Sequence, residues 1–163
     1  MATTLVVDGY NAINAIPETK KKLKTGLPAA RRAIMAISRE YARSSGYITD
    51  IRVVFDGDDR YRYLDALELP RGRSQVFSAT GKGDAKIIDT VRRRSRYGKV
   101  VVASNDNYVR NNSRAYNASL ISVDELAGGK KPAARKAEKA IGKKIDRKVR
   151  EDITREYRRK LGL

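Results

Sequence analysis

The chain has 163 residues and a mass of 18.2 kDa, a size that suits one domain with an appendage. Its 36 lysines and arginines outnumber 19 aspartates and glutamates, so the formal net charge is +17 and a polyanionic partner such as nucleic acid is expected. The absence of cysteine and histidine excludes disulfides, thiolate nucleophiles, Ser-His-Asp catalysis and the usual zinc sites. An enzyme of this composition must rely on carboxylates, lysines, tyrosines or a hard metal ion.

Strand-like and helix-like patterns alternate along the first 127 residues. Short β-branched or aromatic runs predict strands, and apolar residues at helical spacing predict helices. In chain order these are strand 4–7, helix 27–44, strand 51–55, strand 74–78, helix 83–96, strand 100–103, helix 106–116 and strand 119–121. This order predicts an α/β fold with a parallel sheet covered on both faces and functional groups at the carboxyl ends of the strands.

The last part of the chain differs from the rest in charge. Residues 128–163 contain 14 basic and 5 acidic residues, and the breakers Gly128, Gly129 and Pro132 stand at their start. We therefore expect a domain over 1–127 and a basic C-terminal extension over 128–163. Apolar residues recur every four positions in the extension, which predicts a basic amphipathic helix that either packs on the domain or binds nucleic acid or the ribosome.

No apolar run approaches the length that a membrane span needs, and the N-terminus lacks a secretory signal pattern. We expect no membrane partner and a cytoplasmic location, or an organellar stroma in a eukaryote. The oligomeric state stays open.

Aspartates stand where the predicted strands end. Asp8 follows Leu-Val-Val, Asp56 follows Val-Val-Phe, Asp106 comes just after Val-Val-Val-Ala-Ser-Asn, and Asp84 opens a helix after another strand. An aspartate after a strand is also a common helix cap or turn former, as we expect for Asp58 and Asp59. Four at corresponding positions favour a carboxylate cluster instead.

Crowded carboxylates repel one another and need a compensating cation. Oxygen ligands without histidine or cysteine select Mg²⁺ or Mn²⁺. Asp89 does not fit this cluster, because it lies about 140° around the helix from Asp84, and an ion pair with Arg93 explains it better.

Four segments together carry a family resemblance: LVVDGYNAINAIPE, VVFDG, GDAKIID and VVVASND. In order and spacing they resemble the NYN domain of the PIN-like nuclease superfamily, most closely its YacP-like branch of RNA endonucleases, over about residues 3–126. The resemblance leaves the basic extension outside. It implies a Rossmann-like three-layer domain with a Mg²⁺-dependent endoribonuclease site formed by acids at strand ends.

The resemblance also assigns roles to individual residues. Asp8, Asp56, Asp84 and Asp106 match the acids of the family, which implies that they bind the metal and catalyse, and Asn11 matches the asparagine of the DGYN motif. Ser104 matches a hydroxyl that supports the metal ligands, and we also count it among the RNA contacts. Two departures are Ser104-Asn105-Asp106 in place of Thr-Ser-Asp and Gly83-Asp84 in place of Ala-Asp.

Basic and aromatic residues near these acids are candidates for RNA binding. Lys82 and Lys86 flank Asp84, and Arg60, Tyr61, Arg62 and Tyr63 alternate charge with aromatic rings after Asp56. Arginine pairs with phosphates and tyrosine stacks on unpaired bases. A solvated charged surface is the simpler alternative for each run.

The leading hypothesis is a Mg²⁺-dependent endoribonuclease that cleaves mRNA or structured RNA, with the ribosome as a candidate partner, and leaves 5′-phosphate and 3′-hydroxyl ends. The alternative is an RNA-binding or ribosome-associated factor that keeps the fold and cleaves little or not at all. A PIN-type toxin and a membrane-surface protein fit the residues less well.

Overall fold

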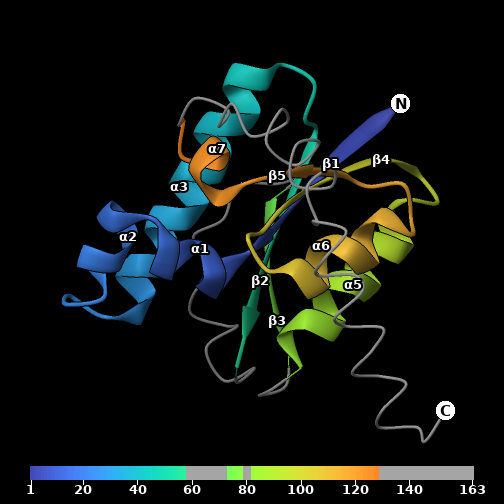
Figure 1. The fold of residues 1–163 in the computed structure, drawn as a ribbon. Coiled ribbons are helices and arrows are strands. Elements are labelled where there is room, and N and C mark those ends of the chain that lie inside the picture. The colour runs from blue at the N-terminus through green and yellow to red at the C-terminus, as the bar shows by residue number, and fades with distance from the viewer. Residues whose placement is uncertain (58–72, 79–81, 129–163) are drawn as a thin grey trace, which may run out of the picture. The chain divides into compact units, whose positions relative to one another are not determined.

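The computed structural model describes residues 1–57, 73–78 and 82–128 (Figure 1). The run Arg60–Tyr63, Asp58 and Asp59, and the extension after 128 lie outside the described residues. In chain order the elements are β1 (Ala2–Asp8), α1 (Gly9–Ala15), α2 (Pro17–Lys22), α3 (Leu27–Ser45), β2 (Asp50–Asp56), β3 (Arg73–Ser78), α5 (Gly83–Arg94), β4 (Gly98–Ala103), α6 (Asn107–Arg114), β5 (Ser119–Ile121) and α7 (Val123–Leu126).

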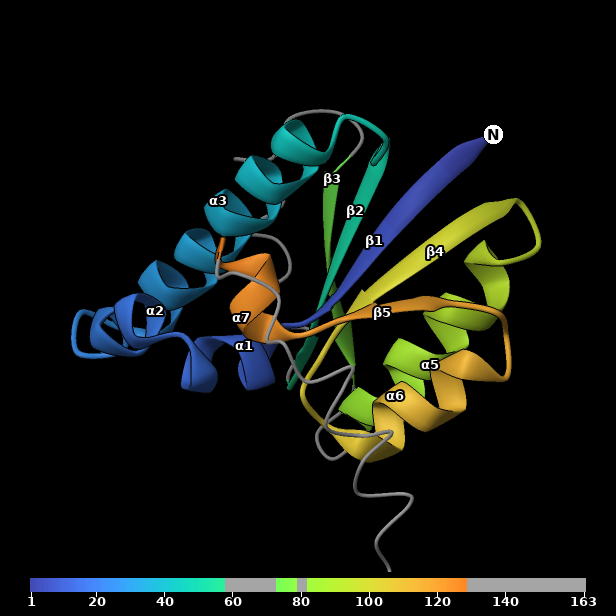
Figure 2. The ribbon, with the colours of Figure 1, turned by 45° about the horizontal axis from the view of Figure 1, so that its top comes forward.

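The strands form one sheet in the order β3-β2-β1-β4-β5, and every neighbouring pair is parallel. Helices α1, α3 and α7 cover one face, while α5 and α6 cover the other (Figures 1 and 2). The predicted α/β fold with three layers and a central parallel sheet is confirmed. All strands end at one edge, which also receives the starts of α1, α5 and α6.

Alternation along the strands divides the core into two clusters. On β1, Leu5 and Val7 face α1 and α3, and Val6 faces α5, where it packs with Ile87 and Val91. Side chains at successive positions of a strand point to opposite faces, so Asp8 lies on the α5 side with Val6. The register of β1 thus decides which face the first acid occupies.

Local signals account for the long helices. Pro28 stands in the first turn of α3, and Gly46 ends that helix in a left-handed conformation, with φ of 71°. In α5, Asp84 lies in the first turn and three arginines lie in the last, each sign matching the helix dipole. Three short helices, α1, α2 and α7, are absent from the sequence prediction.

Within the described residues, no helix is long and apolar enough to cross a membrane.

Candidate active site

The register between β1 and β4 brings the first acid beside a buried serine. Val7 pairs with Ala103, so the next residues, Asp8 and Ser104, lie side by side where the strands end. The Ser104 hydroxyl donates a hydrogen bond of 3.0 Å to Asp8 Oδ2 and accepts one of 3.0 Å from the Asp106 N–H. One fully buried hydroxyl therefore links two of the predicted acids.

Ser104 is engaged entirely within the chain. It is fully buried, and both of its hydrogen bonds join it to the two acids, so the structure shows it as a support for these carboxylates. Its role as an RNA contact stays a prediction.

The second acid reaches the same side of the sheet through β2. Asp8 pairs with Val54, and Asp56 stands two residues further along β2, so that its side chain shares the face of Val54 and Asp8. Gly83 begins α5 directly against it, because a Cβ atom added to Gly83 would lie only 2.8 Å from the Asp56 Cβ. The glycine lets α5 start close to Asp56 and carries Asp84 with it, which gives a physical reason for Gly83-Asp84 in this chain.

Asp106 has two roles. As the N-cap of α6, its Oδ1 accepts a hydrogen bond of 3.0 Å from the Val109 N–H, so the capping interpretation holds for this residue. Asp8 precedes α1 in the same way and makes no such cap hydrogen bond. The Asp8 carboxylate therefore makes no hydrogen bond with the geometry of a helix N-cap, although the Asn11 N–H lies near enough to stabilise its charge.

Asn11 is held from the neighbouring loop. Its Oδ1 accepts a hydrogen bond of 3.0 Å from the Asn105 N–H, and Asn105 Oδ1 in turn accepts one of 3.0 Å from the Val123 N–H. Since the Asn11 carbonyl is engaged by the chain, its amide nitrogen is the group best placed to donate toward a ligand.

These side chains line one pocket with a volume of about 320 Å³. Its walls are formed by Asp8, Tyr10, Asn11, Asn14, Val54, Asp56, Gly83, Asp84, Ile87 and Asp106. The structure thus brings the four predicted acids and Asn11 together, while their roles as ligands or catalysts stay predictions. Asp89 lies away from the pocket and pairs with Arg93 at 2.8 Å as expected, and with Arg92 at 2.7 Å.

The pocket disfavours negative charge. Burial raises the pKa of Asp8 to about 6, with smaller contributions from the charges of Asp84 and Asp106, although the Ser104 hydroxyl and the nearby Asn11 N–H act in the opposite direction. The pKa of Asp84 is also raised, first by desolvation and then by the charges of Asp106 and Asp56. A cation in the pocket would relieve both effects.

No group of three or more acidic side chains in the described ranges is arranged to hold one ion directly. Mg²⁺ usually keeps several of its waters and binds through one or two carboxylates, so the observed set fits a hydrated ion better than a closed cage. The chemistry of the donors, all of them oxygen, agrees with that ion.

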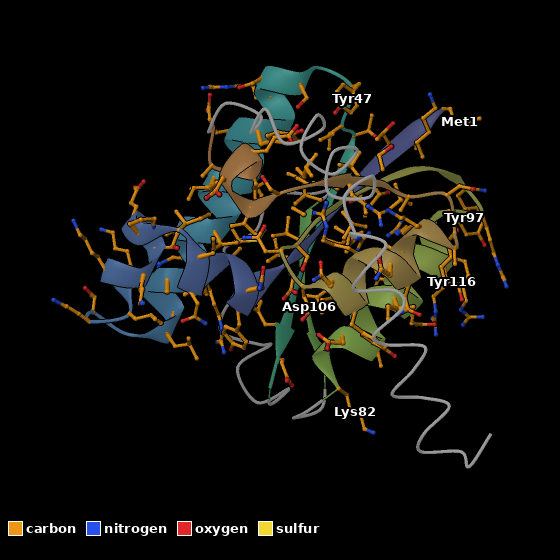
Figure 3. All side chains as sticks on the ribbon, viewed as in Figure 1. Met1, Tyr47, Lys82, Tyr97, Asp106 and Tyr116 are labelled. Carbon is orange, nitrogen blue, oxygen red and sulfur yellow. The ribbon has the colours of Figure 1, made fainter. Side chains whose placement is uncertain are left out.

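Two basic residues near the pocket have different surroundings. Lys82 is exposed at the start of α5. In Figure 3 it lies below Asp106. Lys86 is half-buried, and neither residue lines the pocket.

Tyr10 and Asn14 line the pocket and were missed by the sequence prediction. The hydroxyl of Tyr10 accepts a hydrogen bond of 2.8 Å from buried Arg31, and its ring lies 5.3 Å from that of Phe55. Asn14 donates a hydrogen bond of 2.9 Å to the Tyr10 carbonyl, one helical turn back. Recognition of a helix starting at Gly9 would have placed Tyr10, Asn11 and Asn14 on the same short element.

The structure is thus a Rossmann-like α/β domain with an acid-lined pocket at the carboxyl edge of its parallel sheet. The model of the YacP-like NYN domain matches residues 5–162, so the chain belongs to this nuclease-type family. The match continues through most of the basic extension. The expectation that the region shared with the family ends near residue 126 is therefore wrong.

The fold also resembles solved structures. The crystal structure of Rae1 (YacP) from Bacillus subtilis superimposes with a TM-score of 0.51 at 22% identity, covering 98% of this chain and 86% of that chain. A variant of the same protein gives a TM-score of 0.58 at 24% identity, with 94% and 85% covered. No protein with a curated description matches the sequence.

Proposed function

We propose that this protein is a Mg²⁺-dependent endoribonuclease that cleaves mRNA or structured RNA, in the cytoplasm or an organellar stroma, and acts on ribosome-bound messages. The observation that carries the proposal is the pocket in which Asp8, Asp56, Asp84 and Asp106 meet Asn11. Membership of a nuclease-type family supports the reaction class. The high positive charge supports a nucleic-acid substrate.

The proposed metal ligands are Asp8, Asp84 and Asp106, with Asp56 as a fourth. When bound, Mg²⁺ or Mn²⁺ supplies Lewis acidity at the scissile phosphate and an acidified water for hydrolysis. Hydrolysis by water does not need the ribose 2′-hydroxyl as the nucleophile, so we expect 5′-phosphate and 3′-hydroxyl ends.

The chain itself positions the groups around the substrate. The Ser104 hydroxyl holds Asp8 through Oδ2, and the N-cap interaction of Asp106 fixes the second carboxylate. Asn11, with its carbonyl held by Asn105, is oriented to donate from its amide nitrogen to a phosphate oxygen. Lys82, exposed beside the pocket, adds a cation for the phosphate backbone.

One observation favours a second candidate, an RNA-binding or ribosome-associated factor with little or no cleavage. In the part of the chain that the structure covers, no three acids are arranged to hold an ion without bridging waters. Cleavage separates the two functions, since both predict binding of RNA.

The test is incubation of the purified full-length protein with total RNA and with translating ribosomes, in Mg²⁺ or in EDTA, followed by mapping of the RNA ends. We expect new 5′-phosphate ends in Mg²⁺ and none in EDTA. Binding without new ends in either mixture would favour the second candidate, and cleavage that continues in EDTA would reject the metal site.

A further inference from the structure

Helices α5 and α6 lead away from the pocket. Both begin at the carboxyl edge of the sheet, where Gly83 and Asp106 line the pocket, and both end at the opposite edge. With a rise of 1.5 Å per residue, α5 spans about 17 Å. Residues at the far ends of these helices are therefore too distant to take part in the chemistry at the pocket.

Positive charge gathers at this far end. Between Thr90 and Asn105 the sequence has five basic residues and no acidic one. Asp89 serves two arginines, Arg92 and Arg93, so their charge is only half balanced. Arg96 and Lys99 are exposed and form no ion pair with any residue that the structure describes.

Aromatic rings lie among these cations. Tyr97, with 78% of its surface exposed, follows Arg96 directly. Tyr116 packs partly against the cluster that contains Val91 and lies near enough to Arg92 to interact with its charge. Figure 3 shows Tyr97 and Tyr116 at the end of α5 and α6 that is away from Lys82. We call this surface the α5–α6 basic face; it consists of Arg92, Arg93, Arg96, Tyr97, Lys99 and Tyr116.

An exposed tyrosine ring among uncompensated cations suits an unpaired nucleotide segment better than a purely anionic partner. The cations can pair with phosphates, and the ring gives a base a surface for stacking. A partner that offered negative charge alone would leave the exposed Tyr97 ring without a group to stack on.

We propose that the α5–α6 basic face binds a single-stranded segment of RNA that lies outside the cleaved site, with Arg96 and Lys99 on phosphates and Tyr97 stacked on a base. This inference rests on the proposed function in that RNA is the substrate class. It adds a second contact about one helix length from the pocket, which selects long or structured RNA over short fragments.

The experiment measures binding of the full-length protein in EDTA to a long single-stranded RNA and to inorganic polyphosphate. Tyr97→Ala removes the ring, and the double variant Arg96→Gln/Lys99→Gln removes two charges. The matched control is Arg32→Gln/Arg39→Gln, which removes two exposed charges from α3 on the other side of the sheet. Melting temperatures check that each variant is folded.

We expect Tyr97→Ala to weaken RNA binding by about 5-fold or more and to leave polyphosphate binding unchanged, because only RNA has bases to stack. Arg96→Gln/Lys99→Gln should lower the slope of log affinity against log salt by about 1.4, since each single-strand phosphate contact contributes about 0.7. The control variant should change neither the RNA affinity nor the salt slope by a comparable amount. Wild-type RNA affinity in both face variants would overturn the proposal, and so would equal losses in the control. Equal losses of RNA and polyphosphate binding in Tyr97→Ala would do the same.

Cleavage of a tetranucleotide in Mg²⁺, measured on the same proteins, separates this inference from the proposed function. If the wild type cleaves the tetranucleotide and the face variants bind RNA normally, only the proposal of the basic face is rejected. If RNA binding depends on the face and no RNA is cleaved in Mg²⁺, only the proposed nuclease function is rejected.

Discussion

Asp8 illustrates how a single residue connects folding with function. It ends the central strand, it is largely removed from water, and its pKa of about 6 shows that its ionised form is disfavoured. Ser104 and the Asn11 N–H recover part of that cost by interacting with the carboxylate. An uncharged residue here would avoid this cost, which supports the proposed role of Asp8 in the pocket.

Replacing Asp8 or Asp106 by Asn should abolish cleavage, because each change removes a carboxylate from the pocket. The fold should stay intact, and the metal-free Asp8→Asn protein should be more stable above pH 6, because it buries no charge and has fewer crowded carboxylates. The measurements are cleavage rate in Mg²⁺ and thermal unfolding in EDTA. As a control, Asp124→Asn changes an exposed acid on α7, away from the pocket, and should cleave normally. Full activity in Asp8→Asn and Asp106→Asn, with normal Mg²⁺ dependence, would refute the site.

The raised pKa of Asp8 predicts a dependence of stability on pH in the absence of metal. Because the folded pKa of about 6 exceeds the ordinary value of 3.8, the folded state binds the proton more tightly than the unfolded state. This contribution is fully present below about pH 4 and is lost as pH rises through 6, a loss of about 3 kcal/mol. Urea unfolding in EDTA at several pH values should show wild type losing this amount relative to Asp8→Asn. Parallel curves for the two proteins would show that Asp8 is not perturbed.

At the scale of elements, the start of α5 depends on the absence of a side chain at residue 83. Gly83→Ala would place a methyl group 2.8 Å from the Asp56 Cβ, so the first turn of α5 must shift. We expect a loss of about 1–3 kcal/mol of unfolding free energy together with a lower cleavage rate, because Asp84 moves with the helix.

The control for Gly83→Ala is Gly46→Ala, at the C-cap of α3. That glycine has φ of 71° and open space around it, so alanine strains the backbone without displacing a neighbour. It should lower the melting temperature and leave cleavage per folded molecule unchanged. Equal effects of the two variants on cleavage would show that α5 does not position Asp84.

The elements that the sequence predicts well are those with a long periodic pattern. The five strands and the helices α3, α5 and α6 appear within a few residues of their expected bounds, and the acids at strand ends follow from them. The short helices were missed because each is too brief to show a period. One signal was available: Ser122-x-x-Glu125 is a capping box, and the Ser122 hydroxyl accepts a hydrogen bond of 3.0 Å from the Glu125 N–H.

Other parts of the site could not be predicted, because they depend on register and close approach. The contact of Ser104 with Asp8 requires Val7 to pair with Ala103, and no local pattern specifies that pairing. The role of Gly83 likewise depends on where α5 meets β2. Residue types indicated the chemistry, whereas tertiary geometry decided which side chains support it.

At the scale of the whole molecule, the basic extension is expected to add affinity for RNA. Deleting residues 129–163 removes a net charge of +9, so binding should weaken and lose part of its salt dependence as fewer counterions are released. Binding at several salt concentrations, together with thermal unfolding, tests this. A lower melting temperature with an unchanged salt slope would mean that the extension stabilises the domain instead of contacting RNA.

The place of β1 in the sheet has a consequence for synthesis of the protein. This strand is made first but occupies the centre, and its partner β4 begins only at Gly98. The hydrogen bond that holds Asp8 joins residues 96 positions apart, so one side of β1 stays unpaired while most of the chain is translated. The pocket cannot form in a growing chain until residue 106 has emerged. A product truncated before β4 would carry Asp8 and Asp56 without Asp106, so the acid-lined pocket can form only after about two thirds of the 163 residues have been made.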